Sequence, residues 1–257
     1  VVNGAGAAGV ACLELLKAMG MPNKNAILCD TKGVIHTERT ENLNQWKSAH
    51  AVKTSLRTLE DALKGADVFF GLSIGNIVSE KMVLSMNKNP IIFAMANPEP
   101  EILPEKIKEC RQDAIIATGR SDYPNQVNNV LCFPFIFRGG LDVRATTINE
   151  EMKLAAVHAI ADLARVESSE VVAQAYQGEE LVFGPDYLIP KPFDPRLIVE
   201  VAAAVAHQLR RPALARLLDV EEGRLPFDAE TRHVTCRLVS ILRGVLERPD
   251  IPVQPDL

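Results

Sequence analysis

The sequence of 257 residues has few cysteines, no excess of basic residues and no long apolar run. Its five cysteines are odd in number and never spaced as CxxC, which argues against a disulfide framework and a zinc motif. We expect them to be reduced and mostly buried in a cytoplasmic protein. The net charge of −5 argues against nucleic-acid partners, which need a clustered basic surface. The longest apolar run, around residues 90–96, is far too short to span a membrane.

The most informative pattern present is a glycine fingerprint, Gly4-Ala5-Gly6-Ala7-Ala8-Gly9. In dinucleotide-binding domains the first glycine permits a tight turn, the second lets backbone amides approach the pyrophosphate, and the third lets the helix pack on the sheet. A helix over residues 7–19 would then point its N-terminus at the phosphates. Only three residues precede Gly4 where a strand is needed, so we expect the chain to begin inside a cofactor-binding domain.

The first 130 residues alternate between apolar runs and helical patterns. Strands are predicted at residues 25–30, 66–72, 89–96 and 113–118, and helices between them at 59–64 and 80–86. This order predicts an α/β, Rossmann-type doubly wound, mainly parallel sheet, followed by extra C-terminal helices. Ligands bind such sheets at the carboxyl ends of the strands, where Asp30, Ser73 and Asn97 stand in this sequence.

Asp30 follows the second predicted strand, 21 positions after Gly9. A carboxylate at about this interval binds the adenosine ribose hydroxyls. It favours NAD over NADP, because it repels a 2′-phosphate. The alternatives are a turn-capping role before Gly33, and NADP binding if nearby Lys32 offsets the repulsion.

Two polar segments extend the predicted site. Pro98 restricts the backbone of Asn97, so that the amide can reach a nicotinamide or a small acid; the alternative is an Asn that caps the next turn. The loop over residues 119–130 holds several amides, among them Asn128 and Asn129, which suit a carboxylate ligand.

These segments resemble the malic enzymes of the bacterial type that is often fused to a phosphotransacetylase-like domain. The resemblance covers roughly residues 1–208, and the matching segments are residues 1–9, 29–33, 44–47, 71–73, 96–102, 119–137, 140–145 and 187–196. It implies oxidation and decarboxylation of malate with NAD or NADP, Mg²⁺ or Mn²⁺ in the complete enzyme, and a homo-oligomer. It assigns the fingerprint to the cofactor, Asn97 to nicotinamide and substrate, and Asn128 and Asn129 to malate. Ser73, at the end of its predicted strand, is also expected to contact the cofactor.

The family's catalytic Tyr and Lys and its acidic metal ligands lie upstream of the glycine fingerprint. No catalytic residue and no metal ligand can therefore be assigned in this sequence, and the chain alone is expected to be inactive. Acids such as Glu99 and Glu101 are expected to have surface or turn roles. A dinucleotide-binding module without chemistry and a partner-docking module remain the alternative functions.

Towards the C-terminus, Thr147 and Glu150 have capping-box spacing for a helix that ends near Arg165. Another helix is predicted over residues 195–209, with Pro195 at its start. Residues 1–209 are predicted to form the cofactor domain. Residues 210–257, which contain arginine but no lysine, are predicted to be a separate helical tail with an amphipathic helix over residues 234–245.

Overall fold

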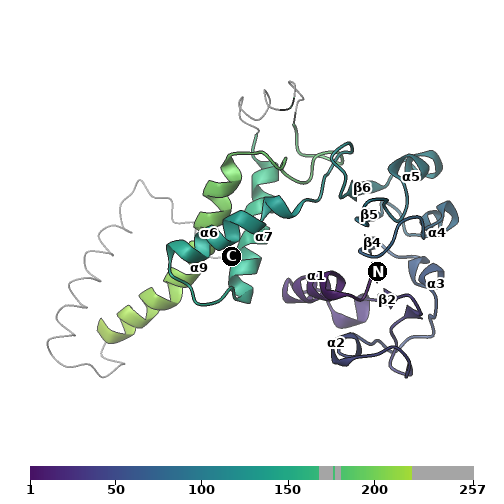
Figure 1. The fold of residues 1–257 in the computed structure, drawn as a ribbon, viewed down its shortest axis with the longest axis horizontal. Helices are drawn as coiled ribbons and strands as arrows, with labels where there is room; N and C mark the ends of the chain where they lie inside the picture. The colour runs from purple at the N-terminus through teal and green to yellow at the C-terminus, as the bar shows by residue number, and fades with distance from the viewer. Residues whose placement is uncertain (168–175, 177–180, 222–257) are drawn as a thin grey trace.

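The computed structural model describes residues 1–167, 176 and 181–221 of the chain, and the side chains only as far as residue 208. Figure 1 shows a twisted sheet covered by helices, and beside it a second group of helices that pack on one another. The sheet provides the site described below, and a loop after its last strand leads into the helical group.

The sheet has six strands in the order β3-β2-β1-β4-β5-β6. In chain order they are β1 (Val2–Asn3), β2 (Leu28–Asp30), β3 (Gly33–Val34), β4 (Val68–Gly71), β5 (Ile91–Ala94) and β6 (Ile115–Thr118). All neighbouring pairs are parallel except β2 and β3, which form an antiparallel hairpin. The predicted mainly parallel, doubly wound sheet is confirmed, and the hairpin strand β3 is an addition to the prediction. The chain order reverses between β1 and β4, the point where such sheets bind ligands.

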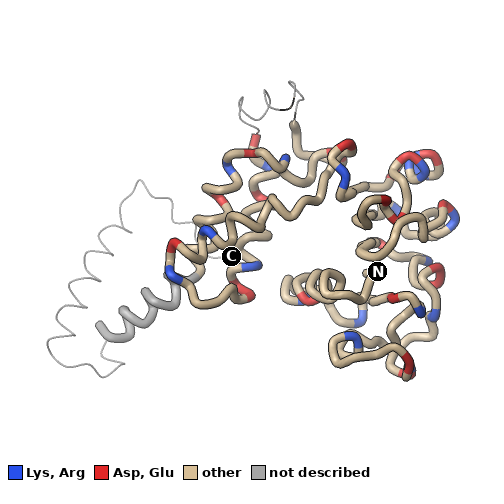
Figure 2. The backbone as a smooth tube through the Cα atoms, viewed as in Figure 1, with Lys and Arg blue, Asp and Glu red and all other residues tan. Residues whose placement is uncertain are grey.

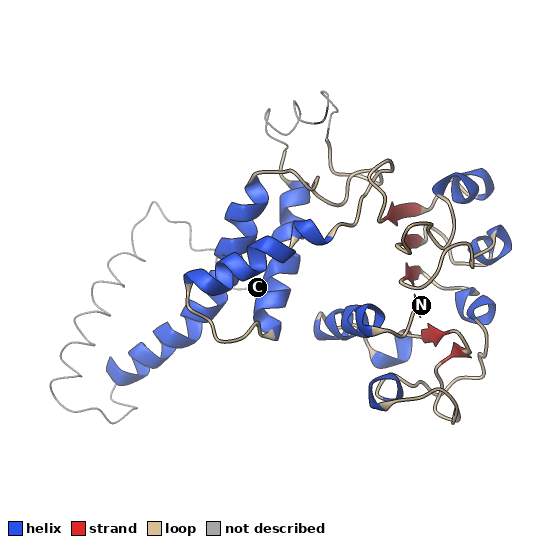
Figure 3. Cartoon of the chain, viewed as in Figure 1, coloured by secondary structure: helices blue, strands red, loops and turns tan. Residues whose placement is uncertain are grey.

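The described helices either pack on the two faces of this sheet or form the group beside it (Figures 1 and 3). They are α1 (Ala7–Ala18), α2 (Gln45–Ser48), α3 (Leu59–Leu63), α4 (Glu80–Leu84), α5 (Pro104–Cys110), α6 (Phe133–Asp142), α7 (Glu150–Arg165) and α9 (Arg196–Glu221), with short 3₁₀ turns η1 (Asn23–Asn25) and η2 (Asn129–Leu131). Helices α3, α4 and α5 lie on one side of the sheet and α1 lies on the other. The consecutive parallel strands are connected by helical crossovers, as parallel pairing requires, whereas β2 and β3 are joined directly as a hairpin.

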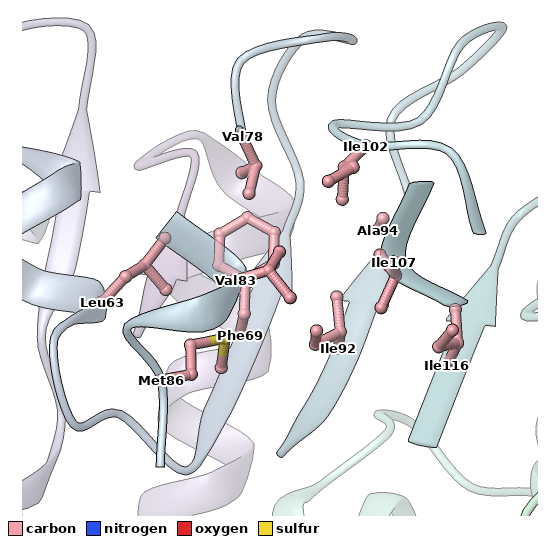
Figure 4. Close-up of a cluster of buried hydrophobic side chains, with 10 residues drawn as sticks. All are labelled: Leu63, Phe69, Val78, Val83, Met86, Ile92, Ala94, Ile102, Ile107 and Ile116. Atoms are coloured by element: carbon pink, nitrogen blue, oxygen red, sulfur yellow. The ribbon is translucent and has the colours of Figure 1, made fainter. Parts of the chain in front are cut away.

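The largest apolar cluster lies between β4–β6 and the helices that cover them (Figure 4). Phe69, Ile92 and Ile107 are at most 1% exposed. Each fully buried side chain of this size stabilises the fold by about 1.5–3 kcal/mol. The cluster fixes the positions at which β4 and β5 end, and the site is built on those ends.

Helices α6, α7 and α9 form the second packing unit. A Cβ added at Gly139 of α6 would lie 2.5 Å from the carbonyl oxygen of Ala202, so a glycine is needed where α6 meets α9. Helix α7 ends at Arg165 as predicted, but its N-cap is Asn149, whose side chain accepts a hydrogen bond from the amide of Met152. The predicted cap at Thr147 is therefore wrong. Both residue types cap helices well, and the chain uses the later one.

Helix α9 begins directly after Pro195, as the sequence predicts, and runs to Glu221 without a break at residue 209. The predicted boundary between the cofactor domain, residues 1–209, and the C-terminal tail, residues 210–257, thus falls inside this helix. The separate character of the tail stays a prediction. The amphipathic helix predicted over residues 234–245 lies outside the described residues. In the part of the chain that the structure describes, no helix has both the length and the apolar character needed to cross a membrane.

Candidate functional site

A groove of about 800 Å³ lies at the carboxyl ends of β1, β2 and β4, where the strand order reverses. It brings together predicted site residues that are up to 69 positions apart in the sequence, from Gly4 to Ser73. Its lining residues are Asn3, Gly4, Ala5, Gly6, Asp30, Thr31, Lys32, Gly33, Lys47, Arg57, Thr58, Leu59, Ser73, Ile74 and Ile77.

The three fingerprint glycines differ in the space around them. A Cβ at Gly4, whose φ is +119°, would lie 2.3 Å from the carbonyl oxygen of Leu72, and one at Gly9 would lie 1.8 Å from that of Gly4. A Cβ at Gly6 would meet no atom within 4 Å. Gly4 and Gly9 are therefore required by the fold itself, whereas Gly6 leaves open space on the groove side.

Gly6 is also the N-cap of α1, and its helix carries no side-chain cap. The first backbone hydrogen bond of the helix runs from the amide of Val10 to the carbonyl of Gly6. The amides of Ala7, Ala8 and Gly9 have no intrahelical acceptor at this position. Together with the positive end of the helix dipole they form an anion site beside the open space at Gly6.

Asp30 ends β2 and lines the groove, but its carboxylate is bound by donors of the chain itself. Oδ1 and Oδ2 accept hydrogen bonds from Nη2 of Arg39 at 2.8 and 2.9 Å, and Oδ2 accepts one from Nζ of Lys47 at 2.8 Å. The backbone amide of Lys32 and the side chain of Asn42 donate two more. A carboxylate has about four lone-pair positions, so the Asp30 oxygens are fully occupied.

The charge balance of the groove follows from these contacts. Burial alone would raise the pKa of Asp30, but the hydrogen bonds from Lys47, the Lys32 amide and Arg39 outweigh it and lower the pKa. Asp30 shares the groove lining with three cations: Lys47 pairs with Asp30, Arg57 pairs with Glu38, which does not line the groove, and none of the described ion pairs includes Lys32. Among the described residues, the groove lining near Asp30 therefore carries a net positive charge. Elsewhere along the described backbone, basic and acidic residues are interspersed (Figure 2).

On the other side of the groove, β1 and β4 are joined through side chains. Nδ2 of Asn3 donates a hydrogen bond to Oγ of Ser73 at 2.7 Å. The backbone amide of Ser73 donates in turn to Oε1 of Glu101, which is 0% exposed. The expectation of a surface or turn role for Glu101 is wrong, because the residue lies beneath the ends of β4 and β5.

The predicted substrate residues lie farther along the same sheet edge. Asn97 follows β5 and Asn129 begins η2, and both are exposed. Asn128 caps η2, because its Oδ1 accepts a hydrogen bond from the amide of Val130. None of the three lines the groove. Their roles with nicotinamide and malate stay predictions.

Two groups of residues with clear roles were not identified from the sequence. Arg39 and Lys47 belong to a segment without strong periodicity, so nothing placed them beside Asp30. Asn125 lies in the amide-rich loop, but it is buried and donates from Nδ2 to the carbonyls of Ile116 and Pro185, so its role is structural.

The described residues do not fit the divalent metal that the resemblance implies. Among the described side chains, those of residues 1–167, 176 and 181–208, no group of three from His, Cys, Asp or Glu could hold a metal ion. No step through a metal can be derived from them.

A doubly wound sheet, whose first strand leads through a glycine turn into a free helix N-terminus, defines a dinucleotide-binding domain. Residues 1–174 match the family model for malic enzyme, NAD binding domain. The chain belongs to the malic enzyme family, and the resemblance seen in the sequence is confirmed.

Individual relatives agree with this assignment. An NADP-dependent malic enzyme of Rhizobium meliloti is 62% identical over 251 residues, which are 97% of this chain and 33% of that protein. An NAD-dependent malic enzyme of the same organism is 54% identical over 206 residues, covering 80% of this chain and 27% of that protein. The crystal structure of an NAD-dependent malic enzyme from Thermotoga maritima has a TM-score of 0.67 at 38% identity, covering 80% of this chain and 50% of that one.

The chain spans about a third of the length of the first of these relatives. The same alignment covers 97% of this chain and therefore extends into residues 210–257.

Proposed function

We propose that this chain binds NADP in preference to NAD and serves as the cofactor-binding part of an enzyme that oxidises and decarboxylates malate. The observation that carries the choice of cofactor is the paired state of Asp30. A carboxylate that selects NAD must offer free oxygens to the ribose, and these oxygens already bind Arg39 and Lys47.

The pyrophosphate fits the anion site at the start of α1. The open space at Gly6 lets phosphate oxygens approach the amides of the first helical turn, which have no acceptor of their own. An added side chain at Gly6 would occupy that space, which explains why glycine stands there although the backbone conformation does not demand it.

The adenosine end of the cofactor then lies over the carboxyl end of β2, where Asp30 lines the groove. Three cations line this end, so a 2′-phosphate with up to two negative charges gains more here than a free hydroxyl does. This reverses the preference for NAD expected from Asp30. The name of the NADP-dependent Rhizobium relative, which shares more identity with this chain than its NAD-dependent counterpart does, supports the same choice.

The nicotinamide end then extends over β4 and β5, on the other side of the reversal in strand order. When bound, the cofactor accepts a hydride from the substrate. Ser73 and Asn97 follow these two strands and can orient the nicotinamide amide. The exposed amide of Asn129, with the partly buried Asn128 beside it, can bind a malate carboxylate.

Calorimetric titration of the chain with NADPH and NADH tests the proposal. We expect NADPH to bind more tightly, with an affinity that falls more steeply as salt is raised, because charges in the groove are screened. Equal affinities and equal salt dependence would contradict the choice of NADP. Binding of neither would contradict cofactor binding altogether.

A further inference from the structure

A buried carboxylate connects the two loops that follow β4 and β5. Glu101 is 0% exposed, and each of its oxygens accepts a backbone hydrogen bond: Oε1 from the amide of Ser73 and Oε2 from the amide of Ala96, both at 3.0 Å. The hydroxyl of Ser73 lies 3.5 Å from Oε1. Ser73 belongs to the loop after β4, and Ala96 directly precedes Asn97 in the loop after β5.

The backbone around Glu101 strengthens this connection. The amides of Asn76 and Val78 donate hydrogen bonds to the carbonyls of Pro100 and Glu101, both at 3.0 Å. Two glycines provide the room. A Cβ at Gly71 would lie 2.3 Å from Cδ of Glu101, and one at Gly75 would lie 2.6 Å from the carbonyl oxygen of Glu99. The two loops are therefore joined by backbone hydrogen bonds and close packing as well as through the Glu101 side chain.

The choice of a carboxylate here is costly for folding alone. Among the described residues no cation forms an ion pair with Glu101, and a buried charge without one is normally avoided. A carboxylate has only acceptors, and both of its backbone partners are donors, so an amide would direct its NH₂ group at one of them. Only the carboxylate can accept from both loops at once.

We propose that Glu101 is a positioning residue that holds Ser73 and Asn97 at a fixed separation against the nicotinamide half of the cofactor. The inference rests on the proposed function, because the strand order places that half over β4 and β5. The adenosine half contacts β2 and the start of α1, which Glu101 does not touch. Loss of the carboxylate should therefore weaken one half of the cofactor site and leave the other unchanged.

The test uses two ligands on the whole chain. NADPH (or NADH, if the chain binds it better) reports on the complete site, and adenosine 2′,5′-bisphosphate (or AMP) reports on the adenosine half alone. For Glu101→Gln we expect dinucleotide affinity to fall on the order of tenfold, as for the loss of a hydrogen bond to a charged group, while affinity for the adenosine half changes less than about twofold. Glu99→Gln, an exposed change two positions away, is the matched control and should alter neither.

Glu101→Asp keeps the charge but is too short to reach both loops, so it should show the same selective loss to a smaller degree. If Glu101→Gln does not fold, Glu101→Asp decides in its place. Equal losses for both ligands, no loss for either, or failure of both variants to fold would overturn the positioning role. Absence of binding by the unmodified chain would instead overturn the proposed function, and this inference with it.

Discussion

Nη2 of Arg39 lies 2.8 Å from one oxygen of Asp30 and 2.9 Å from the other, and neither side chain is more than 7% exposed. Arg39 does not line the groove, whereas Asp30 does. Arg39 therefore neutralises the carboxylate from outside the groove. On the groove side, Lys47 pairs with the same carboxylate and Arg57 with Glu38, which leaves Lys32 as the lining cation outside the described ion pairs. Asp30 then has a structural role in orienting the basic residues around it.

Lys32 tests this account of the groove's charge. It lines the groove, its side chain is exposed, and none of the described ion pairs includes it. Lys32→Ala should weaken NADP binding by about 0.5–1 kcal/mol, the value of an exposed charge pair, and leave NAD binding nearly unchanged. Parallel titrations measure both. Lys88→Ala, which removes an exposed cation far from the groove, is the control, and an equal effect of Lys32→Ala on NAD and NADP would contradict the account.

The glycine fingerprint predicts opposite outcomes at two positions. Gly6→Ala meets no atom in the fold, so it should cost about 0.5 kcal/mol of stability as an N-cap change, yet weaken the dinucleotide on the order of tenfold by filling the phosphate space. Gly9→Ala must displace the backbone of Gly4 and should cost about 3 kcal/mol of stability. Thermal unfolding and cofactor titration separate the two effects. Intact binding by a folded Gly6→Ala chain would show that the phosphates lie elsewhere.

His50 should make the stability depend on pH. Nδ1 of His50 lies 2.7 Å from Nζ of Lys17 on α1, and lysine has only donors, so the imidazole accepts and is neutral. Burial and the Lys17 charge lower the pKa of His50, against a smaller opposing effect of Glu14. A lowered folded pKa means that this stability is present above the unfolded pKa of about 6.5 and is lost as pH falls towards the folded value.

Urea unfolding at pH 7.5 and 5.5 measures this dependence. The free energy of unfolding should decrease at the lower pH, and the decrease should shrink in His50→Asn, which can accept from Lys17 through Oδ1 without titrating. Identical pH dependence in the two proteins would assign the effect to other groups.

Two asparagines of one loop should respond differently to alanine. Asn125 is buried, has φ of +53°, donates to two carbonyls and accepts from the amide of Leu188 at 2.7 Å. Asn125→Ala should cost about 2–3 kcal/mol in unfolding experiments. Asn129→Ala should cost less than about 0.5 kcal/mol, because the side chain is exposed.

The functional part of this prediction needs a chain fused to the remaining part of a malic enzyme relative. In such a fusion Asn129→Ala should raise KM for malate more than KM for the cofactor. An unchanged KM for malate would remove Asn129 from the substrate site.

The sequence predicted those features that depend on local backbone geometry. The turn at Gly4 and the existence of strands before Asp30 and Asn97 follow from glycine spacing and apolar runs, which are visible in a few consecutive residues. The boundaries were less accurate, since the predicted strand over residues 25–30 is observed only from Leu28. Neighbouring elements decide where pairing begins, and a single strand does not contain that information.

The partners of buried charges were not predictable in the same way. Asp30 and Arg39 are nine positions apart, and the β2–β3 hairpin that brings them together was not recognised. Glu101 follows two prolines and has the local sequence of a surface turn. Its burial depends on the missing side chain of Gly71, thirty positions earlier, which only the packed sheet brings into contact.

The final prediction concerns turnover. Malate oxidation needs a base for the C2 hydroxyl, and decarboxylation needs a metal to stabilise the enolate and an acid to protonate it. The described residues contain no group that could hold the metal, and the family resemblance assigns the base and acid to a region before the glycine fingerprint. We therefore expect the purified 257-residue chain to bind cofactor but form no pyruvate from malate, NADP and Mn²⁺. A fusion to the preceding part of the Rhizobium relative is the positive control and should form pyruvate. Turnover by the chain alone that EDTA abolishes would contradict the prediction and require a metal site within this sequence.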